Sequence, residues 1–194
     1  MSGKRVAIVQ SSYIPWKGYF DLIRASDEFI LLDDVQFTKR DWRSRNQIKT
    51  QHGLAWLTIP VRTKGRYHQL IQETEISEPR WGQDHWATLS ANYARAPFFN
   101  AYSDALASLY APHAGSGRLS EVNHRFIITL CKLLGVTTPI RWSTDYGAPA
   151  GKNERLIELC LKAGATDYLS GPNARGYLDE AMFLAAGIQV QFRS

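Results

Sequence analysis

The order of apolar and polar residues in the first third of the chain predicts a strand, a helix and a second strand. Residues 6–10 form a short apolar run, and residues 19–25 repeat apolar positions three to four apart, as one face of a helix does. Residues 28–33 are continuously apolar between Glu28 and Asp33, which is typical of a strand buried on both faces of a parallel sheet. Together these elements predict a right-handed βαβ unit.

In the next segment the spacing of apolar residues is that of strands and not of a helix. Residues 46–50 and 54–61 read as two strands on either side of QHG, where Gly53 is able to adopt a positive φ. They predict a β-hairpin inserted after the βαβ unit. Residues 70–77 predict a further strand or a segment at a sheet edge.

Helical patterns follow the hairpin. Residues 81–110 predict two helices, because Pro97 interrupts the pattern. A loop at 111–118 precedes a long predicted helix at 119–134, which Ser120 is expected to cap.

The last third alternates strands with helices. Strands are predicted at residues 138–146, 166–171 and 188–192, and helices at residues 152–165 and 174–187. The sequence therefore predicts an α/β fold, with a mostly parallel sheet flanked by helices, an inserted β-hairpin and a helical patch. We expect a single domain over residues 1–194.

Composition is that of a globular protein, with 44% hydrophobic and 21% charged residues in 194. Cys131 and Cys160 lie in apolar helical stretches, which indicates reduced, buried thiols. The sequence has no signal peptide and no apolar run near the roughly 20 residues of a membrane span. We therefore expect a cytoplasmic protein that does not interact with membranes.

Positive charge is concentrated in one segment. The chain carries a formal net charge of +5 and has a pI of about 9.3. Eight Lys and Arg residues lie between Lys39 and Arg66, against the single acid Asp41. This stretch is either a solvated basic face or a binding surface for an anionic partner.

In an open α/β sheet, ligands bind beyond the carboxyl ends of the strands. The loop after the first predicted strand, QSSYIPWKGYF, offers Gln10 and Tyr13 as hydrogen-bonding groups, and Gly18 leaves room for an anion near the helix N-terminus. The layout is similar to the first turn of nucleotidyltransferases, but Tyr19 follows Gly18 and the loop has no histidine. The alternative to a binding role is structural: the aromatic residues of this loop cover the edge of the sheet.

Two acids follow the second strand. Asp33 and Asp34 are suited to orient an amine or act as a base, whereas no second acidic cluster completes a metal site, so no metal is expected. The next polar residues are Arg43, Arg45 and Asn46. The two arginines are able to bind a phosphate or carboxylate through bidentate hydrogen bonds. Ion pairing with the aspartates is the competing explanation.

His85 is the best histidine candidate for acid–base chemistry. On a helix, Asn92 and Tyr93 recur near its face, two turns later. Ser170 adds a hydroxyl after a later strand. The sequence contains no G-x-S-x-G elbow and no P-loop.

The sequence resembles the WbqC-like family. The resemblance is carried in order by VAIVQSSYIPWKGYFDLI, FILLDDVQFTKRDWRSRNQIKT, WLTIPV, HWATLSANYARAPFF and ERLIELCLKAGATDYLSGPNARGYLD. The sequence departs from the family pattern at Ser11 and Ser12, where larger residues are usual. It also stops at Ser194, whereas we expect relatives to continue with another apolar segment.

The family resemblance implies an N-acyl- or aminoacyltransferase of O-antigen, other polysaccharide or natural-product biosynthesis. The donor would be an acyl group activated as a phosphopantetheine-linked thioester on an acidic carrier protein, and the acceptor a small amine; no other cofactor is expected. His85, Asp33 or Asp34 would be the base, with Gln10, Asn92 and Tyr93 as hydrogen-bond donors. The other expected substrate-binding residues are Tyr13, Gly18, Tyr19, Arg43, Arg45, Asn46 and Ser170.

Two alternatives remain at this point. The first is a nucleotide or nucleotide-sugar binding protein, or a nucleotidyltransferase-like enzyme, that uses the first strand–loop–helix turn. The second, nucleic-acid binding through the basic stretch with Trp42 and Trp56, ranks last because no recognised nucleic-acid module is present.

Overall fold

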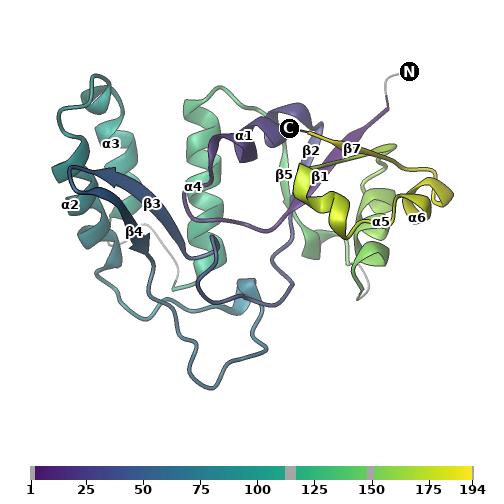
Figure 1. The fold of residues 1–194 in the computed structure, drawn as a ribbon, viewed down its shortest axis with the longest axis horizontal. Helices are drawn as coiled ribbons and strands as arrows, with labels where there is room; N and C mark the ends of the chain where they lie inside the picture. The colour runs from purple at the N-terminus through teal and green to yellow at the C-terminus, as the bar shows by residue number, and fades with distance from the viewer. Residues whose placement is uncertain (1–2, 112–116, 148–150, 194) are drawn as a thin grey trace. The chain divides into compact units, whose positions relative to one another are not determined.

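The computed structural model describes residues 3–111, 117–147 and 151–193 (Figure 1). The chain divides into two compact units. Unit 1 comprises residues 1–11, 16–34 and 128–194, and unit 2 comprises residues 12–15 and 35–127. The single domain expected from the sequence stays a prediction, because this division does not test it.

A five-stranded parallel sheet forms the centre of unit 1. Its strands are β1 (Arg5–Val9), β2 (Glu28–Leu31), β5 (Ile140–Trp142), β6 (Asp167–Ser170) and β7 (Gln189–Phe192). Their order is β5-β2-β1-β6-β7, and every neighbouring pair is parallel. The α/β fold with a parallel sheet is thus confirmed, and β1 and β2 pair directly as the βαβ pattern requires.

Three α-helices lie wholly within unit 1 in the described residues: α1 (Lys17–Ala25), α5 (Asn153–Lys162) and α6 (Glu180–Ala185). Two 3₁₀ turns, η2 (Ser143–Asp145) and η3 (Pro172–Gly176), follow strands β5 and β6. The helix predicted over residues 174–187 is shorter, because the Asp179 carboxylate accepts from the Ala181 and Met182 N–H groups and starts α6 there. Cys131 and Cys160 are free and buried, as predicted.

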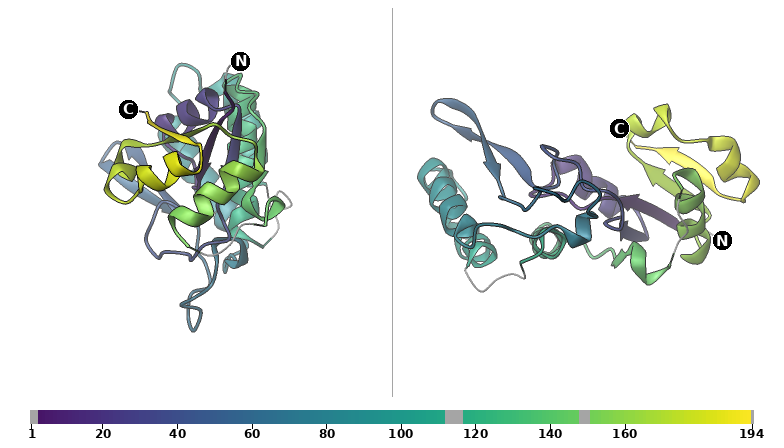
Figure 2. Two further views of the ribbon diagram at one scale, coloured as in Figure 1. Left: turned by 90° about the vertical axis from the view of Figure 1, so that its right-hand side faces the viewer. Right: turned by 90° about the horizontal axis from the view of Figure 1, so that it is seen from below.

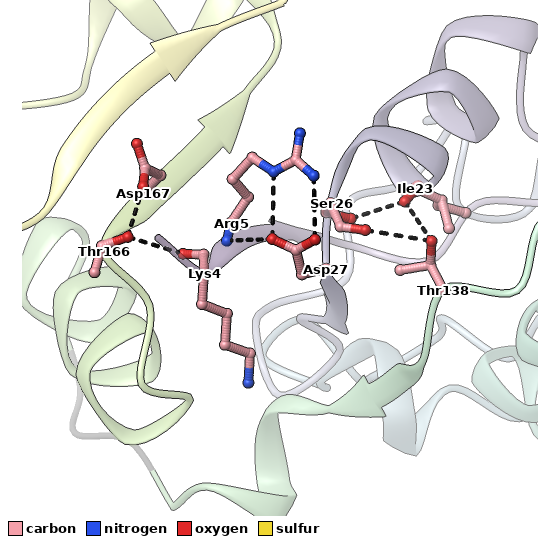
Figure 3. A network of polar contacts seen from close by, with 8 residues as sticks. All are labelled: Lys4, Arg5, Ile23, Ser26, Asp27, Thr138, Thr166 and Asp167. Atoms are coloured by element: carbon pink, nitrogen blue, oxygen red, sulfur yellow. Dashed lines mark hydrogen bonds and ion pairs between the residues drawn. The ribbon is translucent and has the colours of Figure 1, made fainter. Parts of the chain in front are cut away.

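A polar network joins strands at the amino edge of this sheet (Figure 3). Arg5 binds the carboxylate of Asp27 through its backbone N–H at 2.8 Å and through its guanidinium at 3.1 and 3.3 Å. These bonds hold the pKa of Asp27 below its usual value. Thr138 donates to the carbonyls of Ile23 and Ser26, which fixes the chain just before β2. The amino edge is thus tied together by internal hydrogen bonds.

Unit 2 contains the hairpin and the helical patch. Strands β3 (Arg45–Thr50) and β4 (Gly53–Thr58) pair antiparallel, and the Gly53 φ of 105° confirms the predicted turn. The hairpin lies alongside α2 (Trp81–Tyr93) (Figure 2). The Lys49 N–H donates to the Tyr93 hydroxyl at 2.9 Å. Helix α3 (Phe99–Tyr110) follows the break near Pro97, as predicted.

In unit 2 one local prediction is confirmed only in part and another is wrong. Residues 70–77 do not form a strand, but Leu70, Glu75 and Ile76 make isolated antiparallel β-bridges, as a segment at a sheet edge does. Between these bridges the Glu73 carboxylate accepts from the Leu70 N–H and closes the 3₁₀ turn η1 (Ile71–Glu73). Ser120 is not a cap, because α4 (Leu119–Leu133) already includes it and buries it. Most of the loop predicted at 111–118 lies outside the described residues.

The core of unit 2 is aromatic. Tyr13 and Phe126 are fully buried, with ring centroids 5.4 Å apart, and Trp81 and Tyr110 pack against both. Helix α4 contributes Phe126 to this core, and its residues from 128 onward belong to unit 1. No described helix is long and apolar enough to cross a membrane.

Candidate functional site

The carboxyl edge of the unit 1 sheet carries two aspartates with different environments. Asp33, just beyond β2, is 1% exposed, and its carboxylate accepts from the Ser11 N–H at 2.8 Å. Ser11 lies just beyond β1, the neighbouring strand. The Asp33 carboxylate therefore fixes the two loops that leave β1 and β2.

Asp34 forms a cluster with Ser143 and Arg155. Its Oδ1 accepts from the Ser143 hydroxyl at 2.6 Å, and its Oδ2 lies 3.4 Å from an Arg155 nitrogen. The same Arg155 nitrogen donates to the Asp34 carbonyl at 3.0 Å. Both charged side chains are 16% exposed, so this carboxylate is restrained but still reaches the surface of the unit.

Sequence reasoning missed Ser143 and Arg155. Ser143 begins η2 directly after β5, and β5 pairs with β2. Ligands bind beyond the carboxyl ends of parallel strands. This rule would have pointed to Ser143 if the strand predicted at 138–146 had been predicted to end at Trp142, where β5 ends. Arg155 comes from α5, and no local sequence signal connects it with a residue more than a hundred positions away.

The remaining candidates in unit 1 lie near the same sheet edge. Ser170 ends β6 and is 7% exposed, and Gln10 follows β1. Tyr19 is buried, and its hydroxyl donates to the Gln10 carbonyl at 3.1 Å. A Cβ at Gly18 would lie 2.7 Å from the Trp16 indole nitrogen, so the glycine makes room for that ring.

His85 lies in unit 2, where both ring nitrogens are engaged. Nδ1 is 2.8 Å from the Tyr13 hydroxyl, and Nε2 is 3.1 Å from the Thr58 carbonyl. Burial lowers the pKa of His85 and favours the neutral ring. A carbonyl only accepts, so Nε2 carries the proton and Nδ1 accepts from Tyr13. This geometry leaves neither nitrogen available to take a substrate proton without breaking a hydrogen bond.

Tyr13 has no exposed surface. Its hydroxyl also lies 3.2 Å from the Tyr110 hydroxyl, and burial raises the pKa of both phenols. The substrate-binding role expected for Tyr13 stays a prediction. What its contacts establish is a buried hydrogen-bonded link between the opening loop, α2 and α3.

Arg45 and Asn46 hold two strained backbone positions. Ile14 and Arg40 have φ values of 46° and 60°, in the left-handed region that side chains other than glycine seldom adopt. The Asn46 amide donates to the carbonyls of Tyr13 and Ile14, and the Arg45 guanidinium donates to the carbonyl of Arg40. The first two residues of β3 thus fix both turns.

The other unit 2 candidates also bind their own unit. Arg43 is buried, with Nε 3.7 Å from Asp41, and its carbonyl accepts from the Asn123 amide at 2.9 Å. Asn92 is exposed and donates to the Thr88 carbonyl one turn earlier in α2. Tyr93 accepts from the hairpin, as described above.

The candidate residues therefore fall into two groups. Gln10, Gly18, Tyr19, Asp33, Asp34 and Ser170 belong to unit 1, and Tyr13, Arg43, Arg45, Asn46, His85, Asn92 and Tyr93 belong to unit 2. The carboxyl edge of the unit 1 sheet is the candidate functional site, because it has a partly exposed carboxylate with restrained partners. Within the described residues, no group of three or more His, Cys, Asp or Glu side chains is placed to hold a metal ion.

Comparison with known proteins agrees with the family resemblance. A protein of Mycobacterium tuberculosis described as uncharacterized is 51% identical over 187 residues, which cover 96% of this chain and 80% of the relative. No solved structure matches the chain. Residues 10–194 match the WbqC-like protein family. The chain, with its parallel sheet and inserted hairpin, belongs to the WbqC-like protein family.

Proposed function

We propose that the protein is an N-acyl- or aminoacyltransferase that joins an acyl group, activated as a carrier-protein thioester, to a small amine. The observation that carries this proposal is the Asp34 carboxylate at the carboxyl edge of the sheet, held by Ser143 and Arg155 and still partly exposed. A carboxylate in such a position is suited to bind a substrate ammonium group and to accept its proton.

The proposed reaction uses one proton acceptor and one leaving group. The substrate ammonium first loses one proton to solvent, which leaves a free amine. The amine nitrogen attacks the thioester carbonyl, the new C–N bond forms as the C–S bond breaks, and the thiolate leaves. The attacking nitrogen then gives its second proton to Asp34, which passes it to the departing thiolate. Gln10 and Ser170 bind substrate from the neighbouring strand ends, and Asp33 acts as a positioning residue for the Ser11 loop. We assign no proton transfer to His85, because both of its nitrogens are engaged.

The basic stretch is the proposed docking surface for the carrier protein. Lys39, Arg40, Lys49 and Lys64 are exposed, and within the described part of the chain none of their side chains forms an ion pair with a carboxylate. Carrier proteins of this kind are acidic, so the association should weaken as salt rises.

The test is transfer from a loaded carrier protein to a panel of primary amines. We expect Asp34→Asn to lower kcat/KM by about 10²–10⁴-fold, the usual effect of losing a general base. Asp21→Asn is the matched control in the same unit, because Asp21 pairs with Arg193 on the surface. Absence of transfer to every amine, or full activity in Asp34→Asn, would refute the proposal.

One observation favours the second candidate, a nucleotide or nucleotide-sugar binding protein or a nucleotidyltransferase-like enzyme. Helix α1 starts beyond the carboxyl end of β1, has Lys17 in its first position, and has neither a side-chain cap nor an acid in its first turn. Such a helix start attracts phosphate. Thermal-shift screening against nucleotides, nucleotide sugars and coenzyme A separates the two candidate functions. A ligand at 100 times its Kd stabilises the folded protein by about 2.7 kcal/mol, so a nucleotide that binds should raise the melting temperature.

A further inference from the structure

Unit 2 contains a cavity of about 200 Å³ that the proposed reaction does not use. It lies between helix α2, the end of α3 and the first turns of α4. It is partly open to solvent, and its walls combine polar atoms with apolar and aromatic side chains, among them Ile76, Trp81, Tyr110 and Val122. Arg125 also lines it and is the one charged side chain among its described lining residues.

The guanidinium of Arg125 lacks a counter-charge. One of its terminal nitrogens donates to the Leu109 carbonyl at 3.1 Å, and its buried Nε has no hydrogen-bond partner among residues 3–111, 117–147 and 151–193. No carboxylate in those residues forms an ion pair with it. Glu121, four residues earlier on α4, is exposed on the surface. Burial lowers the pKa of Arg125, because nothing offsets the loss of hydration.

Arg125 as a whole is half-buried, but its Nε is fully buried and has no partner in the described residues. An N–H group in that state is costly unless an acceptor lies beside it. A cavity of about 150 Å³ is already large enough to hold a benzene ring. The aromatic walls and Arg125 therefore favour a ligand with an apolar ring or chain and a negative charge at one end.

We propose that this cavity is a binding site for a small organic carboxylate with an apolar ring or branched chain. The carboxylate accepts from the Arg125 N–H groups that Leu109 leaves unused, and the ring or chain packs against Trp81 and Tyr110. A carboxylate that carries a ring or chain fits better than inorganic phosphate, because phosphate has no apolar part to pack against Trp81 and Tyr110. The site is independent of the Asp34 cluster, which belongs to the other unit.

The test is titration of the full-length protein with benzoate, isovalerate, benzyl alcohol and inorganic phosphate by calorimetry. We expect benzoate or isovalerate to bind at least about tenfold more tightly than benzyl alcohol, a difference of about 1.4 kcal/mol. Benzyl alcohol has the ring without the charge. The Trp81 indole N–H resonance, assigned with Trp81→Phe, should shift during the same titration and locate the site.

Two variants separate the cavity from general charge effects. Arg125→Met should weaken carboxylate binding at least about tenfold, because it removes the N–H groups that bind the carboxylate, and urea unfolding checks that the variant is folded. Arg95→Met makes the same substitution at an exposed position outside the cavity and should bind as the wild type does. Equal binding by Arg125→Met and wild type would overturn the proposal. So would the absence of carboxylate binding up to about 10 mM, or preference for phosphate.

Discussion

At the scale of single residues, several side chains expected to bind substrate also hold the backbone in place. Asn46 is the clearest case, because its amide nitrogen serves two carbonyls and its oxygen accepts from the Gln47 N–H. The residue it restrains, Ile14, is β-branched and precedes proline, and both features disfavour its left-handed backbone conformation. The opening loop therefore depends on an amide supplied by the hairpin.

Asn46→Asp should destabilise the protein by about 1–3 kcal/mol, since it removes the donor and places a carboxylate against two carbonyl oxygens. Asn92→Asp is the matched control, because Asn92 is exposed and donates within its own helix, and it should cost less than about 0.5 kcal/mol. Urea unfolding followed by circular dichroism measures both changes. Equal midpoints for the two variants would show that the amide does not support the Ile14 turn.

His85 predicts a pH dependence of stability. Its pKa in the folded protein is lowered by burial, so below about pH 6.5 the unfolded chain takes up a proton that the folded chain does not. Stability should therefore fall as the pH drops from 6.5 toward the lowered pKa, with a limiting slope of about 1.4 kcal/mol per pH unit. His85→Gln should flatten this part of the curve, whereas His52→Gln, at an exposed position, should leave it unchanged. A wild-type slope retained in His85→Gln would contradict this origin.

At the scale of elements, the hairpin was predictable because its signals are local. A glycine at the turn and two strand-like runs identify β3 and β4, and the structure pairs Thr50 with Gly53 as the pattern requires. The errors occur where a single distant or side-chain contact decides the structure. Glu73 closes a turn in a stretch with strand composition, and Asp179 delays the start of α6.

Gly53→Ala should weaken the hairpin, because a side chain at a φ of 105° costs about 1–2 kcal/mol. The substituted Cβ meets no neighbouring atom, so the cost is conformational and not a clash. Hydrogen exchange of residues 45–58 should become about 5–30 times faster. Gly176→Ala is the control, since that glycine is exposed, its φ is not in the left-handed range, and its Cβ would also be unobstructed. Equal effects at both positions would remove the conformational explanation.

At the scale of the whole molecule, the sequence predicted the α/β class and the family, but not how the candidate residues are distributed. The opening loop reads as one segment, yet Gln10 and Ser11 belong to unit 1 and Ser12 to Pro15 belong to unit 2. Spacing along the chain identifies strand ends and hence Asp33 and Asp34. It gives no information on Arg155, which reaches Asp34 only through the packing of α5 in unit 1.

Each unit has its own buried core, and this predicts that the two units open separately. Ile188 is 1% exposed and belongs to the same unit 1 core as the buried Cys160, and Ile59 is 0% exposed in the unit 2 core. Replacing either isoleucine by valine should cost about 0.5–1.5 kcal/mol in its own core. We therefore expect Ile188→Val to raise the rate of Cys160 modification by a thiol reagent about 2–12-fold, because that rate follows the population of the locally opened state. Ile59→Val should leave the rate unchanged. Mass spectrometry of the modified peptide identifies Cys160 and excludes Cys131. Equal acceleration by both substitutions would mean that the thiol becomes accessible only when both units open together.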